Sequence, residues 1–161
     1  MENNSNRKSQ LQMRAVHLLE CLDATSTMYI DDISRLFECY VNSAAERGGV
    51  STSYRKILFH LAHEDGLTQL DLVKRSHLTA PTVSVAIKKM ENEGFVIRKS
   101  DKEDMRQVRV YLTEKGKSHD EFIRRISKEI EEKFLSCLSD EEVKQLNGLL
   151  RRVLENIVRK E

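Results

Sequence analysis

The chain has 161 residues, about the length of one domain, since domains usually span roughly 100 to 200 residues. Apolar residues make up 39% and charged residues 33% of the chain, and the net charge is +1, which excludes a disordered chain and a globally basic nucleic-acid tail. No apolar run approaches the ~20 residues of a membrane span, and the start lacks the apolar stretch of a secretory signal, so we expect a soluble cytoplasmic protein without a membrane partner.

Helix is the expected main element, because only one proline and six glycines interrupt the chain. Residues 1–10 are polar and show no apolar periodicity, so we predict a disordered N-terminus there. Over residues 11–47 apolar side chains recur at helical spacing, and the weak helix formers at residues 25–27 divide this segment into two helices. Gly48 and Gly49 mark the end of the second helix.

Three shorter helices are predicted next, each beginning after a hydroxyl residue that can cap its first turn, namely Ser51, Thr68 and Thr79. Asp71 stands three residues after Thr68, which is the spacing of a capping box. On the third helix, one face carries the residues expected to be buried, Val83, Ile87 and Met90. Its remaining surface is expected to expose Thr82, Ser84, Val85, Lys88 and Lys89.

A β-hairpin is predicted after this helix, which ends at Glu93 and Gly94. Residues 95–97 are apolar strand formers, and apolar and polar residues alternate over 107–112 with the period of a half-buried strand. A polar turn over residues 100–106 joins the two strands. Because so small a hairpin is not stable alone, we expect it to pack against the helices.

Two further helices are predicted near the C-terminus, the first capped by Thr113 and the second by the pair Ser139 and Glu142. The last helix has an apolar face that must be buried, although the middle of the chain already supplies its own core. A second subunit is the natural partner for this face, which consists of Val143, Leu146, Leu150, Val153 and Ile157.

The order of elements over residues 51–113 is helix, short helix, capped helix and hairpin, which is the order of a winged helix-turn-helix. In that architecture the second helix of the pair enters the DNA major groove, and the hairpin contacts the flanking backbone or minor groove. The segment from Gly66 to Gly116 contains ten Lys or Arg and seven Asp or Glu, so its net charge is +3 and that of the remainder is −2. The excess is modest, and the positions of the cations matter more than their number.

The segment from Gly66 to Gly116 resembles the core of the MarR family of bacterial transcription regulators. The resemblance rests on LTQxxL at 67–72, TVS at 82–84, MExxGFV at 90–96, D-x-R at 104–106 and LTEKG at 112–116. It implies a mainly α fold with a small β-hairpin, in which a winged helix-turn-helix DNA-binding lobe over residues 50–113 lies between dimerisation helices over 11–47 and 114–161. The stretch before Thr27 is longer than the family needs, and we interpret it as an added helix.

The function that the resemblance implies is a repressor that responds to a ligand and binds a palindromic operator in double-stranded DNA as a homodimer. The two-fold axis would place the half-site centres about one helical turn apart, ~34 to 36 Å. In the major groove the resemblance places Thr82, Ser84, Val85 and Lys88, with Lys89 on the DNA backbone. In the hairpin it places Arg106 in the minor groove, Asp104 as the residue that orients the Arg106 guanidinium, and Lys102 and Arg109 against the backbone.

Two positions depart from the family pattern. Val85 stands where many members have arginine or another polar residue, so a bidentate guanine contact is replaced at most by contact with a thymine methyl group. Met105 replaces the first arginine of a common pair, which leaves minor-groove contact to Arg106. We therefore expect lower affinity, or binding that tolerates more salt.

The resemblance also implies a ligand site. The family places pockets between the dimer helices and the DNA-binding lobe, where candidate lining residues are Tyr29, Tyr40, Arg55 and His60. Cys39 is a candidate redox sensor, because some family members sense peroxides through a cysteine in this region, although a buried small side chain is the commoner fate of a helical cysteine. His60 and His63 have a spacing that could share a metal, but two ligands are too few for a zinc site.

Neither a cofactor nor enzymatic activity is expected, since the five histidines show no motif-like relation to a nucleophile and no glycine-rich phosphate loop occurs. Two alternatives stay open. One is a helical protein-interaction adaptor with the same fold and no DNA binding, and the other is a thiol-responsive or metal-responsive subtype of the regulator.

Overall fold

The computed structural model describes residues 2–101 and 104–159. Within these ranges the chain forms a mainly α fold with one small antiparallel sheet, as predicted. The elements in chain order are α1 (Glu2–Leu19), α2 (Ser26–Arg47), α3 (Thr52–His63), β1 (Leu67–Thr68), α4 (Gln69–Ser76), α5 (Ala80–Asn92), β2 (Val96–Ser100), β3 (Val108–Leu112), α6 (Glu114–Leu135) and α7 (Asp140–Val158).

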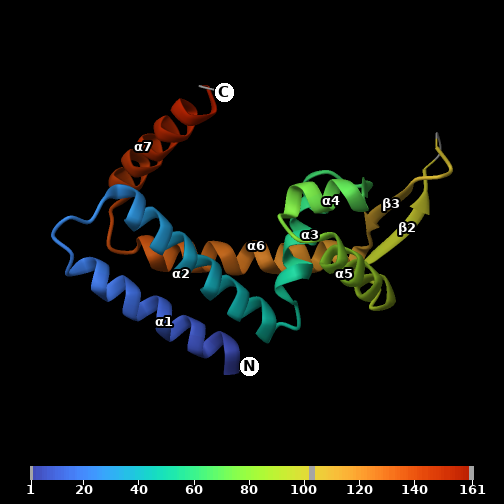
Figure 1. The fold of residues 1–161 in the computed structure, drawn as a ribbon, viewed down its shortest axis with the longest axis horizontal. Coiled ribbons are helices and arrows are strands. Elements are labelled where there is room, and N and C mark those ends of the chain that lie inside the picture. The colour runs from blue at the N-terminus through green and yellow to red at the C-terminus, as the bar shows by residue number, and fades with distance from the viewer. Residues whose placement is uncertain (1, 102–103, 160–161) are drawn as a thin grey trace.

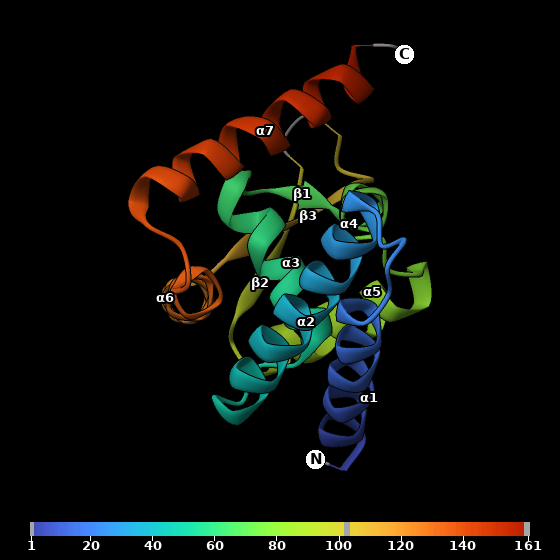
Figure 2. The same ribbon diagram turned by 90° about the vertical axis from the view of Figure 1, so that its left-hand side faces the viewer.

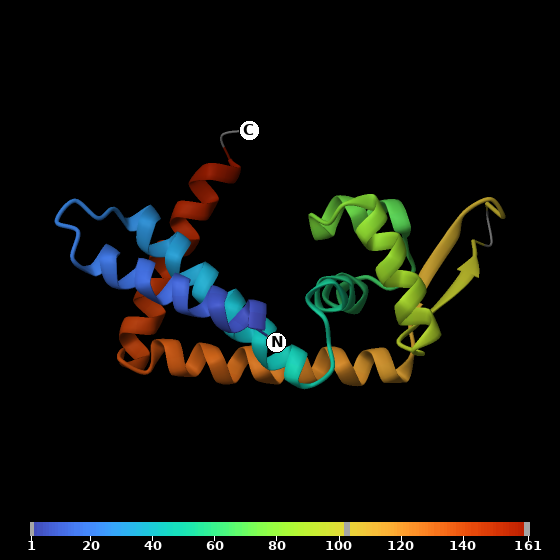
Figure 3. The ribbon, with the colours of Figure 1, turned by 60° about the horizontal axis from the view of Figure 1, so that its bottom comes forward.

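The long helix α6 runs along the longest dimension of the molecule (Figures 1 and 3). One end of α6 packs against α3 and β3, which belong to a lobe that also contains α4, α5 and the β2–β3 hairpin. Its other end lies beside α2, and α1 packs against α2 (Figure 2). The lobe and the α1, α2 and α7 helices therefore lie at opposite ends of the chain's longest dimension.

The lobe has a single apolar core to which every one of its helices contributes. Leu58 of α3, Leu72 of α4 and Ile87 of α5 are each exposed by 1% or less, and Val96 of β2 and Val110 of β3 close the core from the side of the sheet. Burial of a Leu or Ile side chain stabilises a fold by about 1.5–3 kcal/mol. The helix pair and the hairpin are thereby fixed to each other as one rigid unit.

Hydroxyl caps begin the helices where the sequence predicts them. Ser51, Thr68, Thr79, Thr113 and Ser139 each accept a hydrogen bond from the backbone N–H three residues later. Both predicted capping boxes are confirmed, because the carboxylates of Asp71 and Glu142 also accept from the backbone N–H of their cap residues.

The capping box of α4 makes stability depend on pH. Hydrogen bonds from the Thr68 hydroxyl and backbone N–H hold the pKa of Asp71 below its ordinary value of 3.8. A lowered folded-state pKa means that this contribution to stability is fully present above 3.8 and is lost as the pH falls through the folded-state pKa. We expect Asp71→Asn to lower the free energy of unfolding by about 1 kcal/mol near neutral pH, and the difference from the wild type to shrink in acid.

Urea denaturation of both proteins near neutral pH and at about pH 3 measures this effect. Asp23→Asn is the matched control, because Asp23 is exposed in the loop between α1 and α2. A stability difference for Asp71→Asn that is as large in acid as at neutral pH would contradict the explanation.

The predicted disorder of residues 1–10 is wrong, because α1 begins at Glu2. Polar contacts hold this helix against α2, and the periodicity of apolar residues cannot reveal such contacts. The Lys8 ammonium lies 3.9 Å from the centroid of the Tyr40 ring, the Gln12 amide donates to the Tyr40 hydroxyl, and the Arg14 guanidinium lies 2.8 Å from the Asp32 carboxylate. The helix also ends earlier than the apolar spacing suggests, at Leu19.

The sheet has one strand more than the predicted hairpin. Its order is β1-β3-β2, with Leu67 paired to Val110 and Val96 paired to Leu112. A strand of two residues is too short to show alternation, so only the structure reveals it. Gly66, at φ +79°, makes the turn into β1 in a conformation that other residues rarely adopt.

The LTEKG segment joins the hairpin to α6. The Thr113 hydroxyl donates to the Gly94 carbonyl and accepts from the Gly116 N–H, so one side chain holds the turn that follows α5 and also caps α6. A β-carbon at position 116 would overlap the Phe95 carbonyl oxygen. Glycine is therefore required there, because α6 begins directly against the chain that enters β2.

The helices far from the lobe expose apolar side chains. No residue of α7 in its described range is buried, and Leu149, Val153, Leu154 and Ile157 are each more than half exposed. On α1, Met13, Val16 and Leu19 are also more than half exposed. None of the described helices is both long and apolar enough to cross a lipid bilayer.

Candidate nucleic-acid interface

Helix α5 divides into a buried and an exposed face as the sequence predicts. Val83, Ile87 and Met90 are exposed by 1% or less and pack into the core of the lobe. The residues predicted to face DNA are all exposed, namely Thr82, Ser84, Val85, Lys88 and Lys89. Within the described ranges neither lysine forms an ion pair, so both ammonium groups are available to phosphates.

The turn before α5 fixes the direction of this helix. His77 ends α4 in the left-handed conformation, with φ 55°. Thr79 then caps α5, and its hydroxyl lies 2.8 Å from the hydroxyl of Thr82. The first turn of α5, which would enter the groove, is thereby held in one conformation before any DNA is bound.

A tight turn forms the described part of the hairpin tip, which we call the wing apex (Asp104 to Gln107). The Gln107 N–H donates to the Asp104 carbonyl at 2.9 Å, which makes Met105 and Arg106 the two central residues of a β-turn. Both central side chains are exposed. The hairpin projects away from the rest of the lobe (Figures 1 and 3), so the wing apex lies at the outer end of a rigid arm.

The orienting role predicted for Asp104 needs correction. Its carboxylate accepts from the backbone N–H of Arg106 at 3.0 Å and from the Gln107 side-chain amide at 3.1 Å. The Arg106 guanidinium has no hydrogen bond or ion pair within the described ranges. Asp104 therefore fixes the backbone from which Arg106 extends, rather than the guanidinium itself, because a short aspartate side chain reaches a nearby N–H most easily.

Asp101 is a positioning residue that the sequence analysis missed. It is 8% exposed, and its carboxylate accepts from the Asp104 N–H and forms an ion pair with Arg109. Arg109 also donates to the Gly66 carbonyl at 3.0 Å. Because Asp101 follows β2 and Arg109 lies on β3, hairpin pairing of opposite charges was the available signal.

Arg109 is thus engaged within the protein, although the sequence analysis assigned it to the DNA backbone. Its bonds to Asp101 and Gly66 connect the wing to β1, and the ion pair with Asp101 raises the pKa of its guanidinium. Lys102, the other predicted backbone contact in the hairpin, lies outside the described residues.

Removal of the Arg109 side chain should loosen the wing. Arg109→Ala removes the ion pair with the buried Asp101 carboxylate and the hydrogen bond to the Gly66 carbonyl, so we expect the free energy of unfolding to fall by more than the loss of an exposed ion pair produces. Faster hydrogen exchange at the backbone N–H groups of Asp104 and Gln107 should accompany the loss.

Arg98→Ala is the matched control in the same hairpin. Arg98 pairs with Glu91, but both partners are substantially exposed, with 45% and 30% of their side-chain surface accessible. Pairs of that kind contribute about 0–1 kcal/mol. Equal losses for the two variants in denaturant titrations would contradict the positioning role of Arg109.

The four predicted ligand residues lie on two helices, α2 and α3, in different surroundings. Tyr29 is exposed near the start of α2, and Arg55 is bonded to Asn42 and Glu38. On α3, desolvation and the nearby Arg75 lower the pKa of His60. Tyr40 lines a cleft that has a volume of about 470 Å³ and lies between α2 and α6 beside Lys8 of α1.

The redox and metal alternatives gain no support from the described residues. Cys39 is 4% exposed, which denies an oxidant direct access to its thiol, while Cys21 and Cys137 are exposed. No group of three or more His, Cys, Asp or Glu side chains in the described ranges could hold a metal ion.

Comparisons with known proteins agree with this geometry. A family model described as the MarR family matches residues 51–108. YdgJ of Bacillus subtilis (strain 168), an HTH-type transcriptional regulator, is 31% identical over 109 residues, which cover 68% of this chain and 66% of YdgJ. HosA of Escherichia coli, named a transcriptional regulator, is 31% identical over 94 residues, which cover 58% of this chain and 70% of HosA.

Solved structures share the fold along most of the chain. A MarR transcriptional regulator from Methanosarcina mazei Go1 is 29% identical with a TM-score of 0.69, and the match covers 83% of this chain and 96% of that one. A mutant of MepR from S. aureus, bound to an oligodeoxyribonucleotide, is 30% identical with a TM-score of 0.59, and the match covers 83% and 98%.

Proposed function

This chain belongs to the MarR family of helix-turn-helix transcription regulators, and from that premise we propose that it is a homodimeric repressor that binds a palindromic operator and responds to a small anionic effector. One observation supports DNA binding above all: the exposed face of α5 and the preformed wing apex belong to the same rigid lobe. The MepR mutant bound to an oligodeoxyribonucleotide supports the same use of the fold.

In this proposal, different segments of the chain bind DNA and form the dimer. Residues 50–113 form the DNA-binding lobe, and the segments 11–47 and 114–161 form the dimer. Ser84, Val85 and Thr82 meet base edges, and Lys88 and Lys89 meet phosphates. Arg106 enters the minor groove, where the negative potential attracts a guanidinium.

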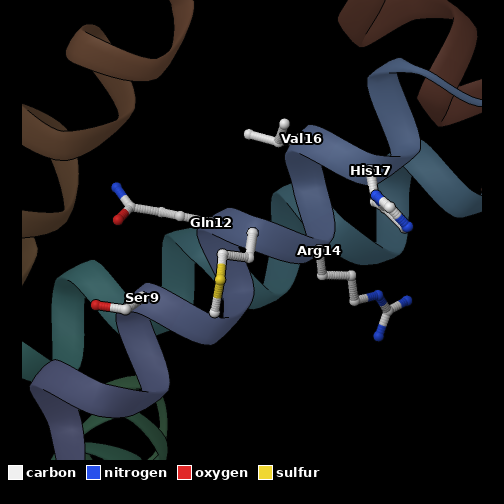
Figure 4. Close-up of a pocket in the computed structure, with 6 residues that line it drawn as sticks. Ser9, Gln12, Arg14, Val16 and His17 are labelled. Carbon is white, nitrogen blue, oxygen red and sulfur yellow. The ribbon is translucent and has the colours of Figure 1, made fainter.

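A second copy of the chain is the partner that the exposed apolar helices require. Large apolar side chains that are more than half exposed lie on both α1 and α7, which belong to opposite ends of the sequence. Figure 4 shows Val16 on α1 together with Ser9, Gln12 and His17, which are among the residues of α1 that line an open pocket. Large apolar side chains exposed in this number mark an association site.

Fluorescence anisotropy with a duplex from the DNA upstream of the chain's own gene tests the proposal. We expect binding that weakens steeply between about 0.05 and 0.2 M salt, because phosphate contacts release counterions. Ser84→Ala should change the base preference rather than the salt dependence. Salt-independent or absent binding would favour the alternative of a protein-interaction adaptor.

The effector site that we propose is the cleft lined by Tyr40. Its cations are Lys8, Arg47 and Lys133, against the single carboxylate of Glu129, so the cleft carries an excess of positive charge. Phe134 packs edge-on against the Tyr40 ring at 5.5 Å and supplies an aromatic wall. A planar aromatic carboxylate satisfies both features, because it offers negative charge at one end and apolar faces along its length.

Thermal unfolding with benzoate and with benzylamine tests this assignment. We expect benzoate to raise the melting temperature of the wild type, since a ligand that binds only the folded state stabilises it. Lys133→Ala should abolish the shift, whereas Lys128→Ala, which changes an exposed lysine on the same helix outside the cleft, should retain it. Equal shifts with benzylamine would contradict an anionic effector.

A further inference from the structure

The wing apex presents an apolar side chain to solvent where turns usually have small polar residues. Met105 is 78% exposed, more than any other large apolar side chain of the described lobe. Met105 does not belong to the core of the lobe or to the exposed helices α1 and α7, since it lies in the turn between β2 and β3. Its exposure costs solvation free energy in the free protein, which points to a use in the bound state.

The backbone under Met105 is held in place before any DNA is bound. Asp104 N–H donates to the buried Asp101 carboxylate at 3.2 Å, and Arg106 N–H donates to Asp104 Oδ1 at 3.0 Å. Gln107 closes the turn by donating to the Asp104 carbonyl at 2.9 Å. Hydrogen bonds thus fix the backbone on both sides of Met105, so the cost of ordering the backbone that carries this side chain is largely avoided on binding.

Met105 and Arg106 are adjacent central residues of one β-turn. If Arg106 occupies the minor groove, Met105 is carried to the floor or wall of the same groove. Proteins that insert methionine or another apolar side chain there partly unstack a base step and kink the duplex. The step that yields most easily is a pyrimidine–purine step, such as TA or CA/TG.

We propose that Met105 is a specificity-determining wedge, which enters the minor groove beside Arg106 and selects operators with a flexible pyrimidine–purine step under each wing. This inference rests on the proposed function, because it needs the lobe to dock on DNA. It adds a base-step preference that the hydrogen bonds of α5 do not supply, and a bend in the bound duplex.

The experiment begins with selection of binding sites by the full chain from duplexes randomised over about three helical turns. We expect a pyrimidine–purine step at a fixed distance on either side of the pseudo-two-fold centre. Replacement of that step by AA in the selected duplex should weaken wild-type binding roughly tenfold. The same replacement should leave the affinity of Met105→Ala unchanged, and Met105→Leu should behave as the wild type.

Two further readouts separate a wedge from a structural effect. Fluorescence of 2-aminopurine at the step should rise when the wild type binds and stay constant with Met105→Ala, and energy transfer between the duplex ends should report a smaller bend for the variant. Val108→Ala is the matched control, because it removes an exposed apolar side chain from the same hairpin. It should retain the step preference.

The outcomes distinguish the two proposals. Failure of the wild type to bind any duplex in a salt-dependent way overturns the proposed function. Tight, salt-dependent binding in which Met105→Ala keeps the step preference and the 2-aminopurine signal overturns the wedge alone.

Discussion

Arg106→Ala should weaken binding to every duplex by roughly 30- to 1,000-fold. The guanidinium is exposed and has no partner within the described residues, so the free protein has already left it available to DNA. The dimer inserts two copies, and each loses about 1–2 kcal/mol of binding free energy. Because both copies also release counterions, the slope of log affinity against log salt should flatten by about two.

Anisotropy titrations of wild type and variant over a salt series measure both quantities. Lys128→Ala is the matched control, because it removes one positive charge from an exposed position on α6, outside the lobe. Its affinity should stay within about twofold of the wild type at moderate salt, since charges more than a Debye length apart are largely screened. An Arg106→Ala protein that keeps the wild-type affinity and slope would show that the wing does not touch DNA.

The exposed and buried faces of α5 were predictable because burial there depends on helical spacing alone. Val83, Ile87 and Met90 fall on one side of the helix, and no distant contact alters that pattern. The caps were predictable for the same reason, since Thr79 and Thr68 bond to N–H groups only three residues away. Interactions between residues close in sequence were therefore enough to predict the helix pair.

The features that could not be predicted from the sequence depend on interactions between residues that are far apart in the chain. The contact of Arg109 with the Gly66 carbonyl spans 43 positions, and no periodicity encodes it. The helical N-terminus depends on Tyr40, which accepts from Gln12 across 28 positions. Asp104 was assigned to the Arg106 side chain because the D-x-R pattern names both residues, but the pattern does not say which atoms bond.

The candidate effector residues show a further limit of the sequence. Tyr29, Arg55 and His60 were grouped with Tyr40 by the part of the fold in which they lie, whereas a cleft depends on which side of a helix each residue faces. Arg55 turns toward Asn42, to which it donates at 2.8 Å. The cleft instead joins Tyr40 to Lys133 and Lys8, from three separate helices.

Leu150→Asp on α7 should convert the dimer into a monomer and weaken operator binding roughly 100- to 10,000-fold, because a monomer loses the second, linked half-site. Leu150 is 40% exposed in the single chain, beside Leu149, Val153 and Leu154, which are more exposed still. A carboxylate in the centre of such a surface would have to be buried without a partner on association, which costs several kcal/mol.

Sedimentation equilibrium and a DNA titration on the same sample test the two halves of this expectation together. No residue of α7 is buried within the described chain, so the substitution should leave the helical signal in circular dichroism unchanged. Gln145→Asp is the matched control, since it places the same carboxylate on the polar side of α7 and should remain dimeric. A Leu150→Asp protein that is monomeric and still binds the operator tightly would contradict this expectation. One DNA-binding lobe would then be enough for the affinity that we attribute to the two lobes of a dimer.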